Sequence, residues 1–176
     1  GKTTTVVNVA KIFSTLGYKT LIIDLDPQGN VSTYLNYDKN PEKDSNAIDL
    51  LEKKNDIVPG KISNNLDILS SNIKISKFNE EKIVGGSKLQ HSFNINKLDS
   101  YDLIIIDTPP TMSSLVQEAL AVSDFYLIPA KPEFLAVEGV AQAMNFAKES
   151  IKSIQNTYHL NTKYLFNKYK IFTLHL

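Results

Sequence analysis

The sequence predicts an α/β fold with a mostly parallel sheet and helices on both of its faces. The main observation is that short apolar runs rich in Ile and Leu alternate with segments of helical periodicity. The runs are apolar at nearly every position, which is typical of strands covered on both faces. A third observation is the absence of any repeat or polar linker, so residues 1–176 are expected to form one domain.

The predicted elements follow from this alternation. Strands are expected at residues 19–25, 66–69, 101–107, 125–129 and 164–166. Helices are expected at residues 3–16, 46–53, 113–122 and 134–154. Gly17 ends the first helix, and residues 26–30 form a loop because Pro and Gly interrupt them. Residues 70–98 are polar and are predicted only as a mixture of helix and loop.

Composition excludes several kinds of chemistry. Lys and Arg together balance Asp and Glu at 19 each, and every one of these cations is a lysine. An arginine finger from within the chain is therefore excluded, and a phosphoryl group would have to be stabilised by lysine, a metal or backbone dipoles. Cysteine is absent, which excludes disulfides, cysteine metal sites and cysteine nucleophiles. No apolar run approaches the roughly 18 residues of a membrane helix.

A first motif, Gly-Lys-Thr-Thr-Thr, spans Gly1–Thr5 directly before a predicted helix. It matches the second half of the phosphate-binding loop G-x-x-x-x-G-K-[ST], in which backbone N–H groups and a helix N-terminus face phosphate oxygens. In that loop the lysine neutralises phosphates and the next hydroxyl binds Mg²⁺, roles that fall to Lys2 and Thr3 here. An ordinary helix start with threonine caps is the alternative.

A second motif places two carboxylates after a buried strand. Asp24 and Asp26 belong to the string Asp-Leu-Asp-Pro-Gln-Gly-Asn, at the end of strand 19–25. Ligands of α/β proteins bind at the carboxyl ends of parallel strands, so both residues are candidates for a site. The alternative is a structural turn, because Asp-Pro and Gly-Asn are common turn formers.

A third motif is the apolar strand Ile104–Ile106 followed by Asp107 and two prolines. A strand that ends in Asp is the pattern that holds Mg²⁺ in phosphate-loop NTPases. A strand-end Asp that only caps the next turn remains the alternative for this short pattern.

The three motifs together, in this order, resemble the ParA/MinD group of P-loop ATPases. The group's loop K-G-G-x-G-K-T-T is similar to Gly1–Thr5, its first switch to Asp24–Asn30, and its metal-binding strand to Ile104–Pro110. The segment Pro129–Gly139 is similar to the group's P-x-x-x-E-x-x-A-L-E-G. The resemblance covers roughly residues 1 to 155. The Asp-Pro-Gln-Gly-Asn string favours the ParA/Soj-type partition branch.

The resemblance implies a P-loop NTPase fold that binds ATP and Mg²⁺ and hydrolyses ATP. For the phosphates it implies that Gly1 belongs to the phosphate loop, that Lys2 contacts the β/γ phosphates as a catalytic cation, and that Thr4 contacts the α-phosphate. For the metal it implies that Thr3 binds Mg²⁺ and that Asp107 holds it through water. Asp24 is expected near the metal and phosphates, and Asp26 is expected to position the attacking water. The resemblance further implies an ATP-bound homodimer, non-specific DNA binding and a ParB-like partner. The expected place is the bacterial cytoplasm, at the nucleoid or a plasmid and not at a membrane.

The sequence also departs from the group's pattern. The signature lysine and first glycines of the loop do not precede Gly1, nor does the strand that is normally central in the sheet. The tail also differs from the group's usual continuation, so the domain is expected to be truncated at both ends and to lack its first strand. Loss of a central strand would expose the edges of its neighbours.

Two other functions stay open. One is a degenerate, catalytically inactive ParA-like fragment. The other is a MinD-like membrane-cycling ATPase, which requires a C-terminal amphipathic basic helix that this tail does not show.

Overall fold

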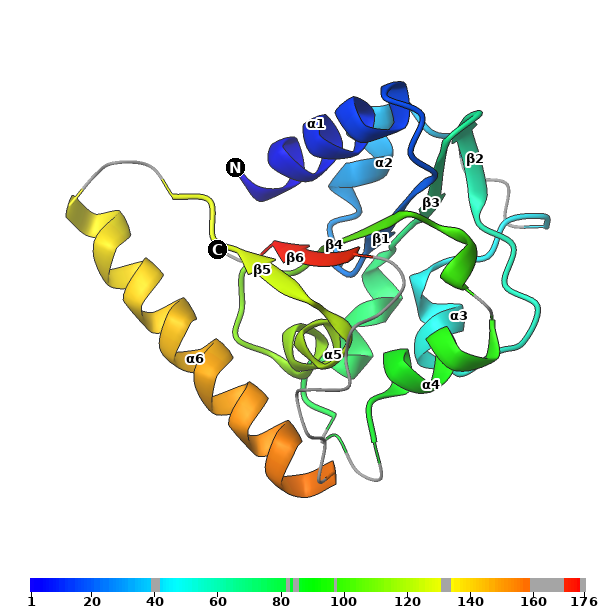
Figure 1. Cartoon of the computed structure of the whole chain (residues 1–176). Coiled ribbons are helices and arrows are strands. Elements are labelled where there is room, and N and C mark those ends of the chain that lie inside the picture. Colours follow the sequence, from blue (N-terminus) through cyan, green and yellow to red (C-terminus); the bar gives the residue numbers. More distant parts are fainter. Residues whose placement is uncertain are drawn as a thin grey trace.

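The protein is built around a mixed, mostly parallel sheet flanked by helices (Figure 1). The computed structural model describes residues 1–38, 42–81, 83, 86–96, 98–130, 134–158 and 170–174. Within these residues the strands lie in the order β2-β3-β1-β4-β6-β5, and all neighbours are parallel except β2 and β3. The strands are β1 (Thr20–Asp24), β2 (Gly60–Ser63), β3 (Leu66–Leu69), β4 (Leu103–Asp107), β5 (Phe125–Leu127) and β6 (Lys170–Leu174).

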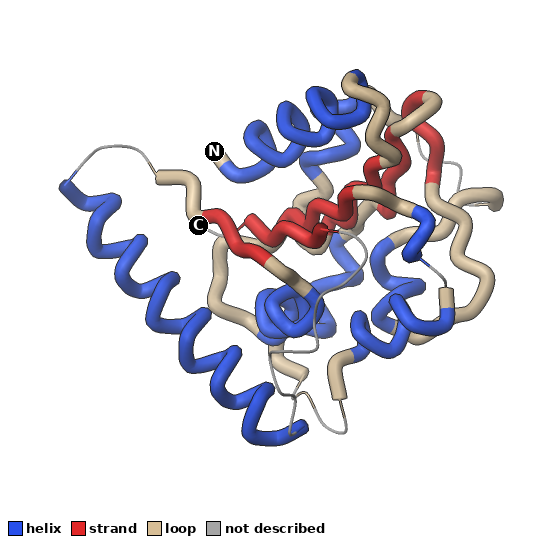
Figure 2. The backbone as a smooth tube through the Cα atoms, in the orientation of Figure 1, coloured by secondary structure: helices blue, strands red, loops and turns tan. Residues whose placement is uncertain are grey.

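The helices cover both faces of the sheet (Figures 1 and 2). Two of them lie on one face, α1 (Lys2–Thr15) and α2 (Asn30–Leu35). The other face carries α3 (Ala47–Leu51), α4 (Lys88–Ile95) and α5 (Ser114–Val122), with the 3₁₀ helices η1 (Ile73–Phe78) and η2 (Leu98–Ser100). The long helix α6 (Phe134–Tyr158) packs against α5. Among these described helices, none has both the length and the apolarity needed to cross a membrane.

The centre of the core is the pair of strands β1 and β4, in which every residue is buried. Side chains alternate along each strand: Ile22 and Ile105 pack in the cluster that includes α1. Ile23 and Ile106 point to the opposite face and pack with α3, α4 and α5. Burial on both faces explains why these runs are apolar without interruption.

The predicted α/β fold with a mostly parallel sheet is confirmed, and most elements lie within a few residues of their predicted bounds. Gly17, predicted to end the first helix, follows α1 with a φ of 95°. The sequence did not predict α2 or β2. The strand expected at residues 164–166 lies outside the described residues, and the structure has its last strand at β6 instead.

Without the strand that is normally central, the edges of the neighbouring strands were expected to be exposed. For β4 this expectation is wrong. This strand pairs with β1 on one side and with β6 on the other. Strand β6 therefore fills the position between β4 and β5, and the backbone groups of β4 find partners on both sides.

The register of the two central strands positions the site. Asp24 is the direct neighbour of Asp107 across the β1–β4 pair, so both carboxylates reach the same edge of the sheet. Because the strands are parallel, this is the carboxyl edge of both.

A test of the packing concerns Gly60, the first residue of β2. A β-carbon at this position would overlap the hydroxyl end of Tyr37, whose OH donates a 2.5 Å hydrogen bond to Asp44. We expect Gly60→Ala to lower the free energy of unfolding by about 1–3 kcal/mol, because the ring must move or the strand must shift. Denaturant unfolding measures the change. In a Tyr37→Ala background the same substitution should cost much less, and an equal cost in both backgrounds would contradict the overlap.

Candidate active site

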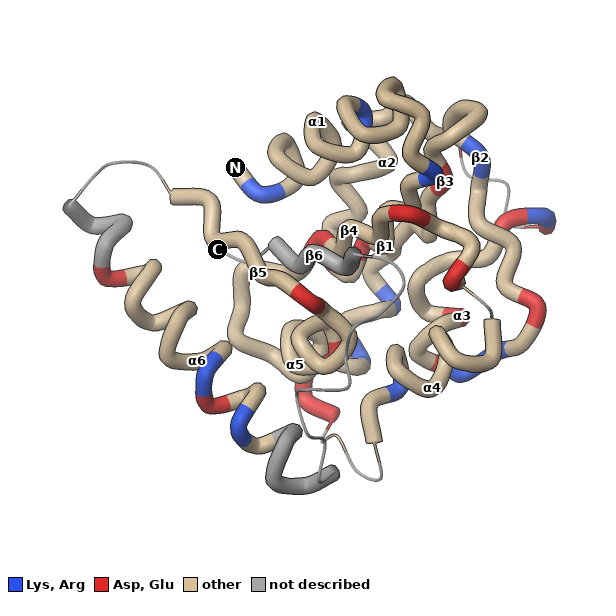
Figure 3. The backbone as a smooth tube through the Cα atoms, in the orientation of Figure 1, with Lys and Arg blue, Asp and Glu red and all other residues tan. Residues whose placement is uncertain are grey.

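The first and third motifs meet at the carboxyl edge of the sheet. The hydroxyl of Thr3, in the first turn of α1, donates a 2.8 Å hydrogen bond from Oγ1 to Oδ2 of Asp107 at the end of β4. Figure 3 shows a basic position at the start of α1 and acidic positions along the backbone where β1 and β4 lie. The bond joins residues 104 positions apart, so the two motifs belong to one site.

Lys2 lies within electrostatic reach of two carboxylates. Its half-buried position lowers the pKa of its ammonium group, while the charges of Asp107 and Asp26 raise it. Gly1 caps the N-terminus of α1 without a side chain, and the first turn carries no acidic residue. Thr4 is exposed on the same turn. Helix N-termini attract anions through their unpaired N–H groups and dipole, so this end of α1 is suited to a phosphate group.

Asp107 carries a buried oxygen that the described residues leave without a hydrogen bond. Its Oδ1 finds no hydrogen-bond partner among the described residues, although the side chain is fully buried. Burial raises the pKa of Asp107 to about 6, against the opposing effects of the Thr3 hydrogen bond and the Lys2 charge. A buried carboxylate oxygen without a partner fits a cation, and Mg²⁺ prefers oxygen ligands.

The described residues hold no cluster of three His, Cys, Asp or Glu side chains arranged as a ready-made metal site. In nucleotide sites Mg²⁺ needs only one or two protein oxygens, and phosphates and water supply the remaining ligands. The Thr3 hydroxyl and the Asp107 carboxylate place two oxygens within 2.8 Å of each other at this point.

Asp24 lies next to Asp107, but both of its carboxylate oxygens accept backbone hydrogen bonds. It is fully buried, with Oδ1 accepting from the backbone N–H of Asp26 at 3.0 Å and Oδ2 from that of Val31 at 3.4 Å. Burial raises the pKa of Asp24 well above its usual range, and the neighbouring charge of Asp107 raises it further.

Asp26 sits in a tight loop between β1 and α2 and is 6% exposed. Its Oδ1 accepts from the backbone N–H of Gln28 at 2.9 Å, and its carbonyl accepts from Gly29 at 2.9 Å. Gly29 has a φ of 63°, and a β-carbon there would lie 3.4 Å from the carbonyl oxygen of Ser71. The loop therefore depends on glycine at this position.

Two serines at this edge were not singled out from the sequence. Ser70 and Ser71 directly follow β3, the neighbour of β1, and are 1% and 6% exposed. The signal that could have found them is the polar pair after a predicted strand, the same signal that found the aspartates.

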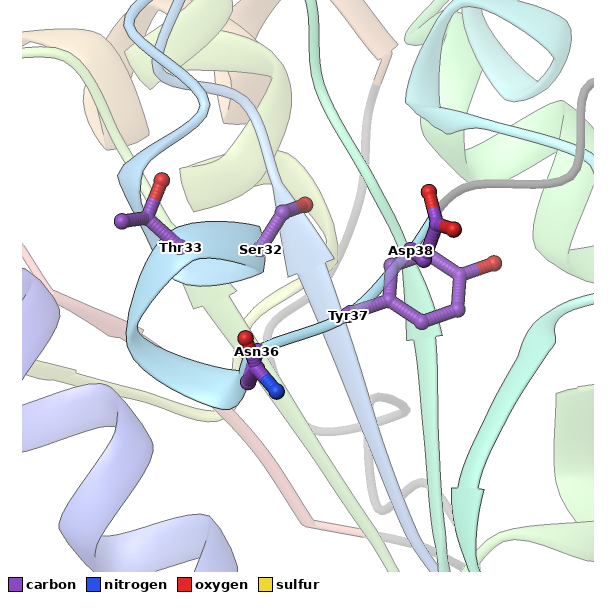
Figure 4. A pocket seen from close by; sticks show the side chains of 5 residues that line it. All are labelled: Ser32, Thr33, Asn36, Tyr37 and Asp38. Atoms are coloured by element: carbon purple, nitrogen blue, oxygen red, sulfur yellow. The ribbon is translucent and has the colours of Figure 1, made fainter.

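The structure also has a hollow beyond α2, lined by Ser32, Thr33, Asn36, Tyr37 and Asp38 (Figure 4). None of the residues predicted for the site lines it. It therefore plays no part in the site at the end of the sheet.

Comparison with known proteins identifies the family. A family described as an AAA domain matches residues 1–162. Sporulation initiation inhibitor protein Soj of Bacillus subtilis is 33% identical over 92% of this chain. The chain belongs to this family, in its ParA/Soj-type branch. Chromosome partitioning protein ParA of Caulobacter vibrioides is 29% identical over 82% of the chain. The chain spans 63% of the length of Soj and 56% of that of ParA.

A solved structure shows the same fold. A plasmid partition protein of Borrelia burgdorferi B31, solved bound to AMPPNP, is 26% identical with a TM-score of 0.69, and the match covers 98% of this chain and 69% of that protein. The predicted branch and the P-loop NTPase fold are thus confirmed.

The raised pKa of Asp107 predicts how stability depends on pH in the absence of divalent cations. A carboxyl group that holds its proton more tightly when folded stabilises the fold at low pH, and this stabilisation is lost as pH rises from about 4 through about 6. The shift corresponds to at most about 3 kcal/mol. We therefore expect Asp107→Asn to make the chain more stable at pH 7.5 in EDTA, measured by urea unfolding.

The matched measurement is the same unfolding at pH 4.5, where the advantage of Asp107→Asn should largely disappear. Asp24, whose pKa is raised in the same direction, keeps part of the pH dependence in the variant. An Asp107→Asn chain that is less stable than the parent at pH 7.5 would contradict the uncompensated charge.

Proposed function

We propose that this chain binds ATP with Mg²⁺ and hydrolyses it, as the ATPase domain of a partition protein. The observation that carries the proposal is the hydrogen bond from Thr3 to Asp107, beside the Lys2 side chain and the open N-terminus of α1. It brings the phosphate-loop motif and the strand-end aspartate together, as a Mg²⁺–phosphate site requires. The Borrelia relative bound to AMPPNP supports the choice of nucleotide.

Each residue has a role in this proposal. Gly1 and the first turn of α1, including Thr4, receive the phosphates, and Lys2 neutralises their charge. Thr3 and Asp107 hold Mg²⁺, the latter directly or through water. When bound, Mg²⁺ neutralises the charge that develops on the transferred phosphoryl group. Asp26 orients the attacking water from the loop after β1.

The dependence on lysine follows from composition. The chain has no arginine, so the charge of the phosphates falls to lysine, backbone N–H groups and the metal, and among the described residues Lys2 lies at this site. Because a phosphoryl transition state gains most from positioning and charge stabilisation, these groups are sufficient in kind for a slow ATPase.

The wider role is also proposed. From the resemblance to ParA/Soj-type ATPases we infer that the ATP-bound protein forms a homodimer, binds DNA without sequence preference and is stimulated by a ParB-like partner. DNA contacts would rest on lysines, and the balanced net charge makes any such surface local. This role places the protein in the cytoplasm at a nucleoid or plasmid, in replicon segregation.

Calorimetry of Mg²⁺-ATP binding tests the proposal. We expect Lys2→Ala to weaken binding by about tenfold or more, since one charge-assisted contact contributes at least about 1.4 kcal/mol. Removal of Mg²⁺ with EDTA should weaken binding in the parent chain, and to a much smaller extent in Asp107→Ala, which lacks the metal ligand.

A second form, extended upstream by a complete phosphate loop, should bind more tightly, because its added N–H groups complete the nest around the phosphates. In that form Asp26→Ala should bind ATP normally and lose hydrolysis by about 100-fold or more. If neither form binds Mg²⁺-ATP, the proposal is wrong, and an inactive ParA-like fragment becomes the better account.

A further inference from the structure

The loop that carries Asp26 is hydrogen-bonded near both of its ends to one buried side chain, that of Asp24. Asp24 is fully buried at the end of β1, where its two carboxylate oxygens accept separate backbone N–H groups, from Asp26 and from Val31. These two amides lie at opposite ends of the loop. The carboxylate therefore fixes both where the loop leaves the strand and where it enters α2.

We propose that Asp24 is a positioning residue for ATP hydrolysis, which holds the Asp26 loop in place and does not contact the nucleotide. The inference rests on the proposed function. It differs from the role near the metal and phosphates that the family resemblance implies for Asp24, because both of its oxygens accept backbone N–H groups, one at the start of the loop and one in the first turn of α2.

The surroundings of Asp24 support a rigid anchor. On the strand side, Asp24 pairs in register with Asp107, and the carbonyl of Asp107 accepts from the N–H of Leu25 at 2.8 Å. On the helix side, Val31 is fully buried in the cluster with Val6 and Ala10 of α1. Both ends of the loop are thus fixed to elements that also carry Lys2, Thr3 and Asp107.

Hydrogen bonds within the loop fix the position of Asp26. Between the ends of the loop, the Asp26 carboxylate and carbonyl accept from Gln28 and Gly29, so the position of Asp26 depends on the course of the whole loop. A catalytic group that orients water must be held closely, since displacement of about 1 Å costs about 100-fold in rate. Loss of the anchor should therefore reduce turnover far more than nucleotide affinity.

Asp24→Asn tests this role. An asparagine keeps the size but offers one acceptor oxygen, so one of the two loop amides must face the side-chain NH₂ group. We expect kcat for ATP to fall by at least about tenfold while KM and the calorimetric Kd for Mg²⁺-ATP change by less than about threefold. Equal losses in binding and turnover would overturn the proposal, since they would mean that Asp24 acts on the nucleotide or metal itself; unchanged turnover would also overturn it.

Amide hydrogen exchange on the unmodified chain provides a second test that does not depend on a variant that folds. The amides of Asp26 and Val31 should exchange at least about tenfold more slowly than that of the exposed Asn30, because each bonds to a fully buried carboxylate. Equal exchange rates at these positions would contradict the anchor. Asp26→Ala is the matched control, which should lose turnover and keep this protection.

The kinetic and the hydrogen-exchange measurements together distinguish a failure of the positioning role of Asp24 from a failure of the proposed ATPase function. If the parent chain does not hydrolyse ATP, the proposed function fails while exchange still decides whether Asp24 holds the loop. If the parent hydrolyses ATP and the Asp24→Asn chain matches it, the proposed function stands and the positioning role falls.

Discussion

The site depends on the in-register parallel pairing of β1 with β4. This register sets Asp24 beside Asp107 at the carboxyl edge, and a slip of one residue would turn every side chain of a strand to the opposite face. It is fixed by burial: the apolar residues of both strands are enclosed by α1 on one face and by α3 to α5 on the other. The hydrophobic core thus determines which polar groups meet, and α1 then brings Lys2 and Thr3 to them.

The same burial makes the site electrostatically unfavourable in the protein alone. Asp24 and Asp107 are fully buried and Asp26 nearly so, and mutual repulsion adds to the cost of desolvation. Lys2 is the cation that the described residues bring to this cluster, and it is itself partly desolvated. A divalent cation would relieve the repulsion among the carboxylates. Buried like charges with strongly perturbed pKa values are typical of functional sites, and a bound metal ion would be the largest local charge in such a site.

Much of this was predictable from the sequence. The strands β1 and β4 were predictable because strands covered on both faces are apolar at nearly every position, and the aspartates that end them stood out against those runs. The few apolar residues of β3 also indicated a strand, although Asp67 interrupts them. The edge strand β2 was missed because its side chains alternate in burial over only four residues and include Gly60. Helix α2 was missed because it is short and begins directly after Gly29, where the pattern indicates a turn.

The contacts within the site were less accessible to sequence reasoning. That Thr3 meets Asp107 follows only from the family resemblance or from the fold, because the two residues are far apart in the chain. The bond from Asp24 to the amide of Val31 depends on the path of the loop, which no residue pattern specifies. Likewise, the polar residues Ser70 and Ser71 gain their place at the edge only through the pairing of β3 with β1.

The most direct test of the site is diffraction from crystals of this chain grown with ATP and Mn²⁺, with manganese located by its anomalous signal. We expect a manganese peak within bonding distance of Thr3 Oγ1, beside Asp107 Oδ1 or one water away from it, with phosphates at the N-terminus of α1. A metal or nucleotide bound elsewhere, with the Thr3–Asp107 hydrogen bond intact, would contradict it.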